Sequence, residues 1–562
     1  MDIQRIILIG ALAVISYIMV LQWQKDYGAP EQPVQATTVS SHSAAPEITT
    51  TTEQLGTDIP SATSTVQQGN VSDSPVEQQA SATDAGQLIR VKTDVLNLLI
   101  DPYGGDIIHA ELNEYLAQLG AEQKLVVLEQ NDNRSYIAQS GLTGKNGPDA
   151  SGGRPRYQVS SAEFEMGDSD QLVVDLTLTQ ESGVKITKRF TLTRGKYQIA
   201  VDYLIENNSD QPWQASLFGQ IKRDNSDDPS SQTSMGMQSY LGPAFSSTET
   251  PYNKVSFDDL DDAKYADKTQ GGWVAMLQHY FVSAWVPNPE TSHSYFGKAR
   301  NGNYFAGFVS PALSLAAGEK GSTGATFYVG PKIQKLLEET APNLELTVDF
   351  GWLWWIALPL FIALDMIQDV VVNWGLAIIL VTLAVKALFY PLSAKAYTSM
   401  AKMRSVGPEL TRLKELYGDD RQKMSAAMME LYKKEKINPL GGCLPIVIQM
   451  PVFIALYWVL LESVELRHAP FVLWIQDMSV MDPYFVLPIM MGLTMFIQQT
   501  LNPTPPDPMQ AKVMKMLPIV FTFFFLWFPA GLVLYWVVNN ILSILQQWMI
   551  TRKIEAAGLG KK

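Results

Sequence analysis

The sequence MLPIVFTFFFLWFPAGLVLYWVVNNILSILQQWMIT, at residues 516–551, contains 36 residues and no charged side chain. As a single helix it would extend about 54 Å, well beyond the roughly 30 Å of hydrocarbon in a bilayer. Near its middle, Pro529 and Gly531 both disfavour continuous helix. The stretch therefore predicts two membrane-spanning helices joined by a tight turn, and with them a polytopic α-helical membrane protein.

Four other stretches are apolar enough to be spans, which brings the expected number to six. Residues 6–23 carry no charge, and no small-x-small cleavage site follows them, which favours an uncleaved anchor over a cleaved signal peptide. The other three lie in the last third of the chain, at 370–390, 444–461 and 484–498. We therefore expect one early span and five clustered late ones.

Positive charge lies between alternate spans and predicts their orientation. Residues 392–440 contain ten Lys and Arg, whereas residues 462–483 contain only Arg467. Further cations lie at 501–515 and after residue 551. Because basic loops stay in the cytoplasm, we expect both ends of the chain there, and we expect the region after the first span to be exported.

The net charge of −14 combines two very different regions. Residues 24–348 contain 23 Lys and Arg against 40 Asp and Glu, a net of −17, whereas residues 349–562 have a net of +3. A nucleic-acid-binding protein would need a basic face, and a disulfide scaffold would need more than the single cysteine, Cys443. Both classes are excluded.

The exported region divides into a tether and a β domain. Residues 26–89 contain no Lys or Arg and are rich in Ser, Thr, Gln and Pro, a composition typical of a disordered linker. Farther on, polar and apolar residues alternate with period two at 171–178, 185–192 and 197–205, which predicts strands of a large antiparallel β-sandwich. A helix is expected near 332–339.

These patterns predict a linear order of segments. It comprises a membrane anchor at 1–25, a disordered exported linker at 26–89, a β-sandwich domain at 90–345, an interfacial helix at 346–369, a second span at 370–392, a cytoplasmic helical hairpin at 393–440, spans three to six at 441–552 and a short basic tail at 553–562.

The β domain offers little chemistry for an enzyme. Its histidines, His109, His279 and His293, have no metal-ligand spacing, and neither a nucleophile elbow nor a phosphate-binding loop is found in its sequence. We therefore expect a binding or spacer module, with no cofactor, metal or catalytic residue.

Residues 350–363 contain three tryptophans and precede the second span. They are too few to cross a bilayer, and indole rings favour its interface. This segment predicts an amphipathic helix lying in the outer interface. A failed span and a core helix of the β domain are the alternatives.

One cation stands inside the late spans. Lys386 is the only charged residue within them, and either snorkelling to the cytoplasmic interface or a functional role explains it. Polar groups in hydrocarbon normally face each other or water. Other polar residues of the spans, one turn away or in neighbouring spans, predict a hydrated groove open to the cytoplasm together with Lys386: Thr382, Gln449, Thr494, Asn539 and Asn540.

Residues 393–436 have the pattern of a helical hairpin, with Gly418 and Asp420 as the C-cap and N-cap of its two arms. Apolar residues, many of them methionine, line its arms: Met400, Met403, Leu410, Leu413, Met424 and Met428. Methionine-rich surfaces adapt to varied apolar partners, but two arms packed on each other would explain the same pattern.

The order of these segments resembles that of the YidC membrane protein insertases of Gram-negative bacteria. Three strings carry the resemblance, YPLSAKAYTSMAKMR at 390–404, INPLGGCLPIVIQMPVF at 437–453 and DPMQAKVMKMLPIVFTFFFLWFPAGLVLYW at 507–536. It implies an inner-membrane insertase with a five-helix core and a periplasmic domain resembling an inactive sugar-mutarotase supersandwich. It also implies nascent membrane proteins, the Sec translocon with its accessory subunits and membrane lipids as partners, with a weak or transient ribosome contact.

In that family the cation of the groove is commonly arginine, and Lys386 stands at the matching position. Lysine attracts a carboxylate but lacks the two-pronged fork of arginine. We hypothesise that a substrate's polar or acidic tail enters the groove while its apolar helix slides out against lipid-facing surfaces near Met450, Phe453, Phe525 and Trp536. A solute transporter or channel, and an anchored carbohydrate enzyme, are the rival functions. No inverted repeat supports the first, and the second needs paired acids, whereas Asp258–Asp259 and Asp261–Asp262 have the pattern of solvated turn residues.

Overall fold

The computed structural model describes most of the chain after the predicted linker. The described residues are 59–60, 87–149, 153–230, 239–417, 420–435, 437, 444–502 and 508–556. All of them belong to one compact unit, Thr57–Lys562. The predictions for the anchor at 1–25, for nearly all of the linker and for the cap at Gly418 therefore lie outside the described residues.

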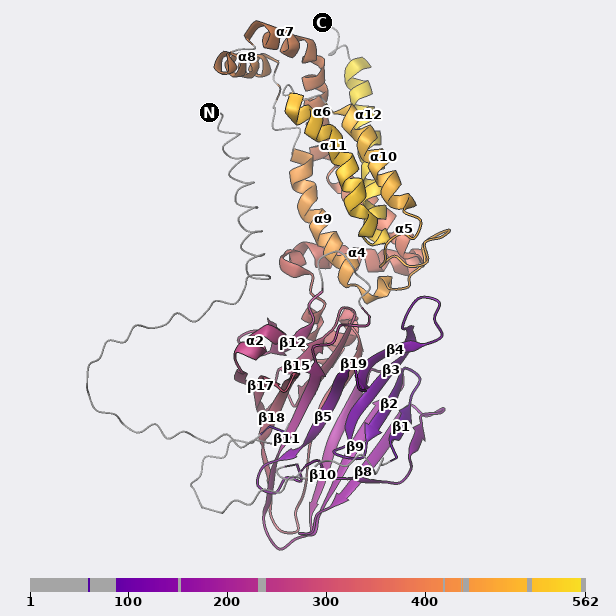
Figure 1. Ribbon diagram of the computed structural model, residues 1–562, viewed down its shortest axis with the longest axis vertical. Helices are drawn as coiled ribbons and strands as arrows, with labels where there is room; N and C mark the ends of the chain where they lie inside the picture. The colour runs from indigo at the N-terminus through magenta and orange to yellow at the C-terminus, as the bar shows by residue number, and fades with distance from the viewer. Residues whose placement is uncertain are drawn as a thin grey trace, which may run out of the picture. The chain divides into compact units, whose positions relative to one another are not determined.

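Residues 89–331 form two large sheets (Figure 1). The ten-stranded sheet has the order β14 (Tyr265–Gln270), β17 (Ser292–Arg300), β18 (Asn303–Leu315), β11 (Trp213–Asp224), β5 (Ser135–Thr143), β4 (Lys124–Gln130), β3 (Asp106–Leu116), β2 (Leu96–Asp101), β1 (Ile89–Lys92) and β7 (Glu163–Glu165). The nine-stranded sheet has the order β13 (Asn253–Lys254), β12 (Gly242–Ser246), β15 (Trp273–Leu277), β16 (Phe281–Pro287), β19 (Lys320–Pro331), β10 (Gln198–Asn207), β9 (Val184–Thr193), β8 (Gln171–Thr179) and β6 (Gln158–Val159).

The strands form where the alternating pattern predicted them. The stretches at 171–178, 185–192 and 197–205 are β8, β9 and β10, which pair antiparallel in sequence order. In β10, the buried residues Ile199 and Val201 alternate with Ala200 and Asp202, which are only half-buried. The period-two pattern therefore separates a core face from an outer face, as side-chain alternation along a strand requires.

Large aromatic side chains fill the space between the two sheets. Trp285 of β16 packs on Phe308 of the other sheet, with ring centroids 6.5 Å apart, and its indole nitrogen donates to the Gln220 carbonyl over 3.2 Å. The Tyr136 hydroxyl lies 2.7 Å from Ser283 Oγ across the same gap. The two sheets therefore share one core, and hydrogen bonds such as these two cross it.

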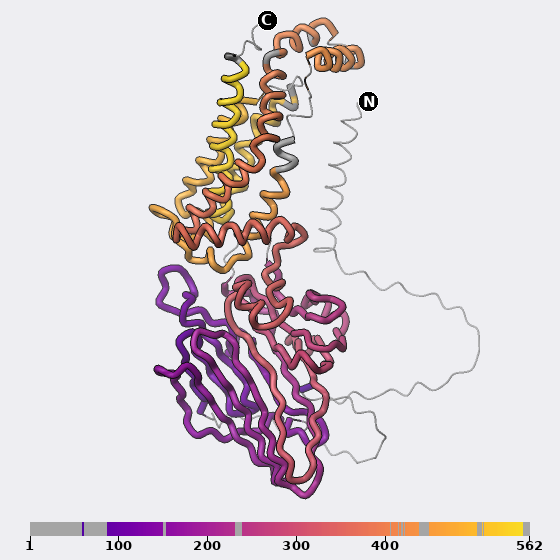
Figure 2. Tube along the Cα trace, turned by 180° about the vertical axis from the view of Figure 1, so that it is seen from behind, coloured from indigo at the N-terminus to yellow at the C-terminus, as the bar shows by residue number. Residues whose placement is uncertain are grey.

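The rest of the described chain is helical (Figures 1 and 2). A short helix, α3 (Gln334–Thr340), follows β19 near the predicted position. The helices after it are α4 (Trp354–Val371), α5 (Trp374–Leu388), α6 (Tyr390–Ser405), α7 (Gly407–Tyr417), α8 (Arg421–Lys434), α9 (Leu444–Glu462), α10 (Val486–Leu501), α11 (Pro508–Phe524) and α12 (Ala530–Ala556). In both views α9 to α12 run alongside one another and α4 lies crosswise to them.

The break expected inside residues 516–551 is confirmed. Helix α11 ends at Phe524, a 3-10 turn covers Phe525–Trp527, and α12 begins at Ala530, directly after Pro529. The turn is held against another segment, because the Ala530 amide donates to the Val480 carbonyl over 2.7 Å.

Two helix lengths differ from the prediction. With its leading 3-10 turn, α4 covers Gly351–Val371, which is 21 residues, so the expectation that this segment is too short to cross is wrong on length. Pro359 is accommodated inside the helix, which ends only where Val372 adopts a left-handed conformation (φ 52°). The next span is shorter than expected: α5 has 15 residues, and α6 follows it at a bend of 69° because Pro391 begins a new helix there.

Length and composition alone select few spanning helices in the described part of the chain. One helix, Gly351–Val371, is long and apolar enough, and the bent pair of α5 and α6 passes as a broken span. Two shorter apolar helices lie at Gln449–Glu462 and Val486–Leu501. The count of six spans stays a prediction.

Candidate functional site

A row of neutral polar side chains runs along α12. Their spacing of three, four or seven residues places them on adjoining faces of the helix, and each is at most 6% exposed. They are Asn539, Asn540, Ser543, Gln546 and Gln547. We call these five residues the α12 polar row. A helix that is otherwise strongly apolar thus buries a polar surface against its neighbours.

Lys386 contacts the α12 polar row through Ser543. Lys386 of α5 is half-buried, and its ammonium donates to Ser543 Oγ over 2.8 Å. Ser543 in turn donates to the Asn539 carbonyl over 2.7 Å. Among the described residues, no Asp or Glu forms an ion pair with Lys386. In the described part of the chain, one neutral hydroxyl therefore binds this charge.

The other predicted groove residues also meet α12, but at separate points. Gln449 of α9 donates to the Tyr535 hydroxyl over 2.8 Å, and Asn540 donates to Thr494 Oγ1 of α10 over 3.3 Å. Thr382 instead donates to the Ile378 carbonyl of its own helix over 2.6 Å. Five of the six predicted residues thus lie along α12, in pairs rather than around one centre.

Sequence reasoning missed several partners. Gln547 donates to the Leu501 carbonyl over 3.1 Å, and Gln546 donates to the Tyr390 carbonyl over 3.5 Å. Ser543 is the residue that binds Lys386. Their positions in the sequence could have indicated this face. Ser543, Gln546 and Gln547 lie four, seven and eight positions after Asn539, and residues at these spacings share a helix face.

Two acceptors of the polar row stay open. Asn539 Oδ1 and Gln547 Oε1 are buried and meet no hydrogen-bond donor among the described residues. A buried amide oxygen without a donor costs about 1–3 kcal/mol. The polar row therefore buries two acceptors whose hydrogen-bonding capacity is unused among the described residues.

The predicted sliding residues gather around one aromatic cluster. Phe453 of α9 packs edge-to-face on Trp536 of α12 at 4.9 Å, and Phe525 lies 5.8 Å from the same indole. Met450, one turn before Phe453, is 43% exposed. Phe525 is only 3% exposed, so its expected lipid-facing position is wrong: the 3-10 turn after α11 directs it into the cluster.

The expected hairpin contains three helices rather than two arms. Helix α6 ends at Ser405 and α7 begins at Gly407, because Pro408 cannot continue the preceding helix. The predicted cap at Asp420 is confirmed, since its carboxylate accepts from the Gln422 and Lys423 amides over 3.2 and 3.1 Å.

The hairpin has a small core of its own. Val406, Leu431 and Ile437 are buried, and Met403, Leu410 and Leu413 pack against them. The arms therefore cover part of their own apolar surface, as the alternative interpretation predicted. Methionines outside this core remain half-buried or exposed: Met400, Met424, Met428 and Met429.

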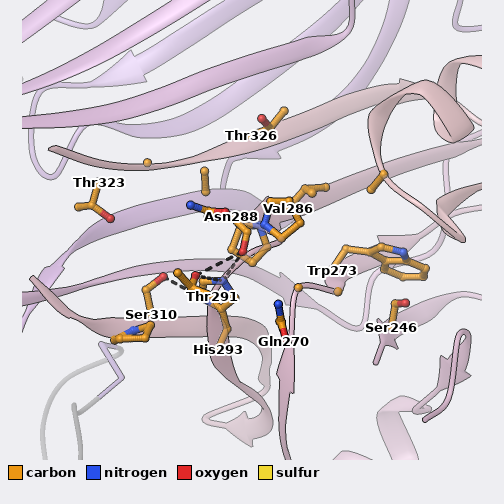
Figure 3. Close-up of a pocket in the computed structure, with 18 of the residues that line it drawn as sticks. Ser246, Gln270, Trp273, Val286, Asn288, Thr291, His293, Ser310, Thr323 and Thr326 are labelled. Carbon is orange, nitrogen blue, oxygen red and sulfur yellow. Dashed lines mark hydrogen bonds between the residues drawn. The ribbon is translucent and has the colours of Figure 1, made fainter. Parts of the chain in front are cut away.

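A separate cavity of about 870 Å³ lies in the β region (Figure 3). Hydroxyl and amide side chains dominate its lining, and Asp202 is its one charged lining residue. His293 lies against it with both ring nitrogens engaged, Nε2 2.7 Å from the Asn288 carbonyl and Nδ1 3.0 Å from Ser310 Oγ. Burial lowers the pKa of His293. The histidine is thus a neutral structural residue.

Metal binding has no support in the described ranges. No group of three His, Cys, Asp or Glu lies there in a position to hold an ion. His279 stacks on Tyr280 with ring centroids 3.8 Å apart, and its Nε2 meets a backbone carbonyl.

Comparison with known proteins places the whole chain in one family. Residues 88–363 match the family model of the YidC periplasmic domain, and residues 366–557 match that of the 60Kd inner membrane protein. Among solved structures, the crystal structure of an active YidC insertase is similar with a TM-score of 0.37 and 19% identity, over 82% of this chain and 92% of that one.

Curated relatives are similar over their full length. The membrane protein insertase YidC of Stutzerimonas stutzeri (strain A1501) is 56% identical over 566 residues, covering 99% of both chains. Those of Pseudomonas fluorescens (strain SBW25) and Marinomonas sp. (strain MWYL1) are 56% and 54% identical, covering 99% of this chain and 99% and 100% of the relatives. The chain belongs to the family of YidC membrane protein insertases.

Proposed function

We propose that this protein inserts newly made integral membrane proteins into the bacterial inner membrane and assists their folding, alone or with the Sec translocon. Identity of 54–56% to full-length insertases supports this function. The observation that carries it is Lys386, a half-buried cation whose one partner within the described ranges is a hydroxyl of the α12 polar row.

The polar residues would form a hydrophilic groove open to the cytoplasm. In this proposal, the groove receives the polar or acidic tail of a substrate, which then has less hydrocarbon to cross. Lys386 attracts the acidic groups of the tail. Asn539 Oδ1, which is buried without a donor among the described residues, would accept from the tail only after α12 moves away from its neighbours. Thr382, Gln449, Thr494 and Asn540 complete the polar lining.

The apolar helix of the substrate would leave the groove along α9 and α12. Met450 is exposed there, and Phe453 and Trp536 form an aromatic surface beside it. No step in this path needs a nucleotide, because transfer of apolar surface from water is favourable by about 25 cal/mol per Å² and the membrane potential acts on charged tails.

The cytoplasmic hairpin would receive the nascent segment before it enters the groove. Exposed and half-buried methionines next to cationic residues fit an apolar segment arriving from a ribosome, to which the basic tail would bind weakly or transiently. Contacts with the Sec translocon and its accessory subunits, and with membrane lipids, belong to the same proposal.

For topology we propose six spans, with both chain ends in the cytoplasm and the two-sheet region in the periplasm as a β-sandwich domain. The charge distribution supports this orientation, because the basic segments all fall on one side of the spans. We assign α4 to the outer interface: Trp352, Trp354 and Trp355 are 60–72% exposed there, and the helix lies crosswise to α9 to α12. Its length also allows a crossing.

The protein is an insertase rather than an enzyme, and the similarity to full-length insertases gives the transporter or channel alternative no support. The β-region cavity, with its neutral histidine, adds no catalytic group.

Site-specific photocrosslinking tests the proposed path. A photoreactive residue at Met450 should form adducts with a stalled nascent membrane protein. Ile519 of α11 is the control, because it is an apolar position away from the polar row and, at 62% exposed against 43% for Met450, it is the more accessible of the two. Equal adducts at both positions, or none at Met450, would exclude the path along α9.

A further inference from the structure

The C-terminal end of α9 is enclosed by side chains from the β region. The last residue of the helix is Glu462, whose side chain is 2% exposed. Helix ends leave their last four carbonyls without intrahelical donors and carry a partial negative charge. A buried carboxylate at that position is therefore unfavourable unless cations and donors from elsewhere surround it.

The two-sheet region supplies these groups. Lys332, at the end of β19, donates to Glu462 Oε2 over 3.0 Å and is itself 3% exposed. Ser239 donates to the other oxygen, Oε1, over 2.7 Å. Both carboxylate oxygens are thus bound by residues more than 100 positions away in the sequence.

A backbone contact adds to this end cap. The Leu461 carbonyl, in the last turn of α9, lies 2.9 Å from His279 Nε2. Since a carbonyl only accepts, Nε2 carries the proton, and Nδ1 is left buried without a partner among the described residues. The Lys332 ammonium also donates to the Thr347 carbonyl over 3.3 Å. The cation is therefore fixed from both sides.

The loop after α9 makes a further connection. Arg467 donates to the Ala117 carbonyl over 2.9 Å, and its guanidinium lies 5.8 Å from the ring centroid of Phe281. Ala117 directly follows β3, and Phe281 is the first residue of β16, so the two contacts reach the ends of two different strands. The end of α9 is thus held at several points, with Glu462 at the centre.

Helix α9 carries this constraint toward the proposed substrate path. Met450 and Phe453 lie on the same helix, about 14–18 Å from Glu462 at 1.5 Å per residue. Although α9 contains Pro451, it is continuous from Leu444 to Glu462, so fixing its C-terminal end constrains the position of residues about three turns away. The contacts of Lys332, Ser239 and His279 with the end of α9 therefore help to determine where Phe453 packs on Trp536.

We infer that Lys332 is a positioning residue for insertion: by capping α9 through Glu462, the β region sets the place of the helix that guides the substrate. This inference rests on the proposed insertase function. It assigns the β region a direct part in the geometry of the membrane path.

The test compares three variants of the full-length protein with an exposed control. Lys332→Met leaves Glu462 buried and unpaired, whereas Lys332→Met combined with Glu462→Gln removes the unpaired charge and protects folding. Lys332→Arg keeps the positive charge. The control, Lys196→Met, removes a 2.9 Å ion pair with Glu339 whose side chains are 40% and 45% exposed.

Two readouts are needed, namely insertion of a single-span client in proteoliposomes and hydrogen exchange of the amides in the last turn of α9. We expect Lys332→Met and the double variant to lower insertion about tenfold and to speed exchange at Val459–Glu462. Lys332→Arg should recover much of both, and Lys196→Met should change neither.

The inference is overturned if the double variant folds and inserts the client as the unmodified protein does, or if insertion falls without faster exchange in α9. Failure of the proposed function itself looks different, because the unmodified protein would then insert no client.

Discussion

Replacing Lys386 by methionine tests whether its charge attracts the substrate. Methionine keeps most of the length of the side chain and removes the ammonium, which donates to Ser543 Oγ and pairs with no acid in the described part of the chain. A carboxylate of the substrate about 4 Å from the ammonium would gain about 1 kcal/mol in water and about 4 kcal/mol at the effective dielectric constant of a protein surface.

These limits correspond to a loss of about fivefold to several hundredfold in insertion. The half-burial of Lys386 places the expected value between them, at about ten- to fiftyfold. Lys386→Glu replaces attraction by repulsion and should lower insertion further.

The assay uses two versions of one client that differ only in the translocated tail, acidic in one and with amides in place of the acids in the other. Insertion into proteoliposomes is measured by protease protection. Only the acidic client should respond strongly to Lys386→Met. Ser543→Ala is the matched control, because it removes the hydrogen bond but keeps the charge. It should cost about 1.5–3 kcal/mol, to the same extent for both clients. An equal loss for both clients with Lys386→Met would refute the reasoning and leave Lys386 a structural residue.

Three other outcomes follow from the structure. Burial raises the pKa of Glu465 to about 7. The folded protein therefore keeps a proton that the unfolded chain releases at about pH 4.5. The contribution of this proton to the stability of the fold is complete below about pH 4.5 and is lost as pH rises through about 7. Glu465→Gln should therefore flatten the fall in thermal midpoint over that range, and an unchanged slope would contradict the assignment. Trp285→Ala should destabilise the two-sheet region by about 3–5 kcal/mol, measured by hydrogen exchange of β16, whereas a cost below about 1 kcal/mol would mean that the core repacks. Asp420→Ala should lower the stability of α8 by about 1 kcal/mol, seen as faster exchange of the Gln422 and Lys423 amides, and unchanged exchange would show that the cap contributes nothing.

Local patterns predicted much of the secondary structure. Pro529 marked the break between α11 and α12, alternation marked β8, β9 and β10, and Asp420 marked the start of α8. These features depend on short-range rules, namely the missing amide of proline, the alternation of side chains along a strand and the capping of free amides. Such rules act within a few residues and are visible in a sequence.

Long-range packing decided what the sequence did not reveal. Pro391 is visible in the sequence, but the 69° bend between α5 and α6 is not, and Phe525 is buried because the 3-10 turn after α11 directs it into the aromatic cluster. Ser543 carries no mark that distinguishes a partner of Lys386 from an ordinary serine in a span. Nothing links Lys332 to Glu462 before the chain folds, since 130 residues separate them.

The α12 polar row has a consequence for how the protein is made. Ser543, Tyr535 and Asn540 complete hydrogen bonds for residues of α5, α9 and α10, all of which leave the ribosome earlier than α12. Until α12 enters the membrane, those earlier helices carry polar groups in hydrocarbon without these partners. Biogenesis of this insertase therefore has an ordered last step, and chains interrupted before α12 should be recognised and degraded as incomplete rather than accumulate as partly active protein.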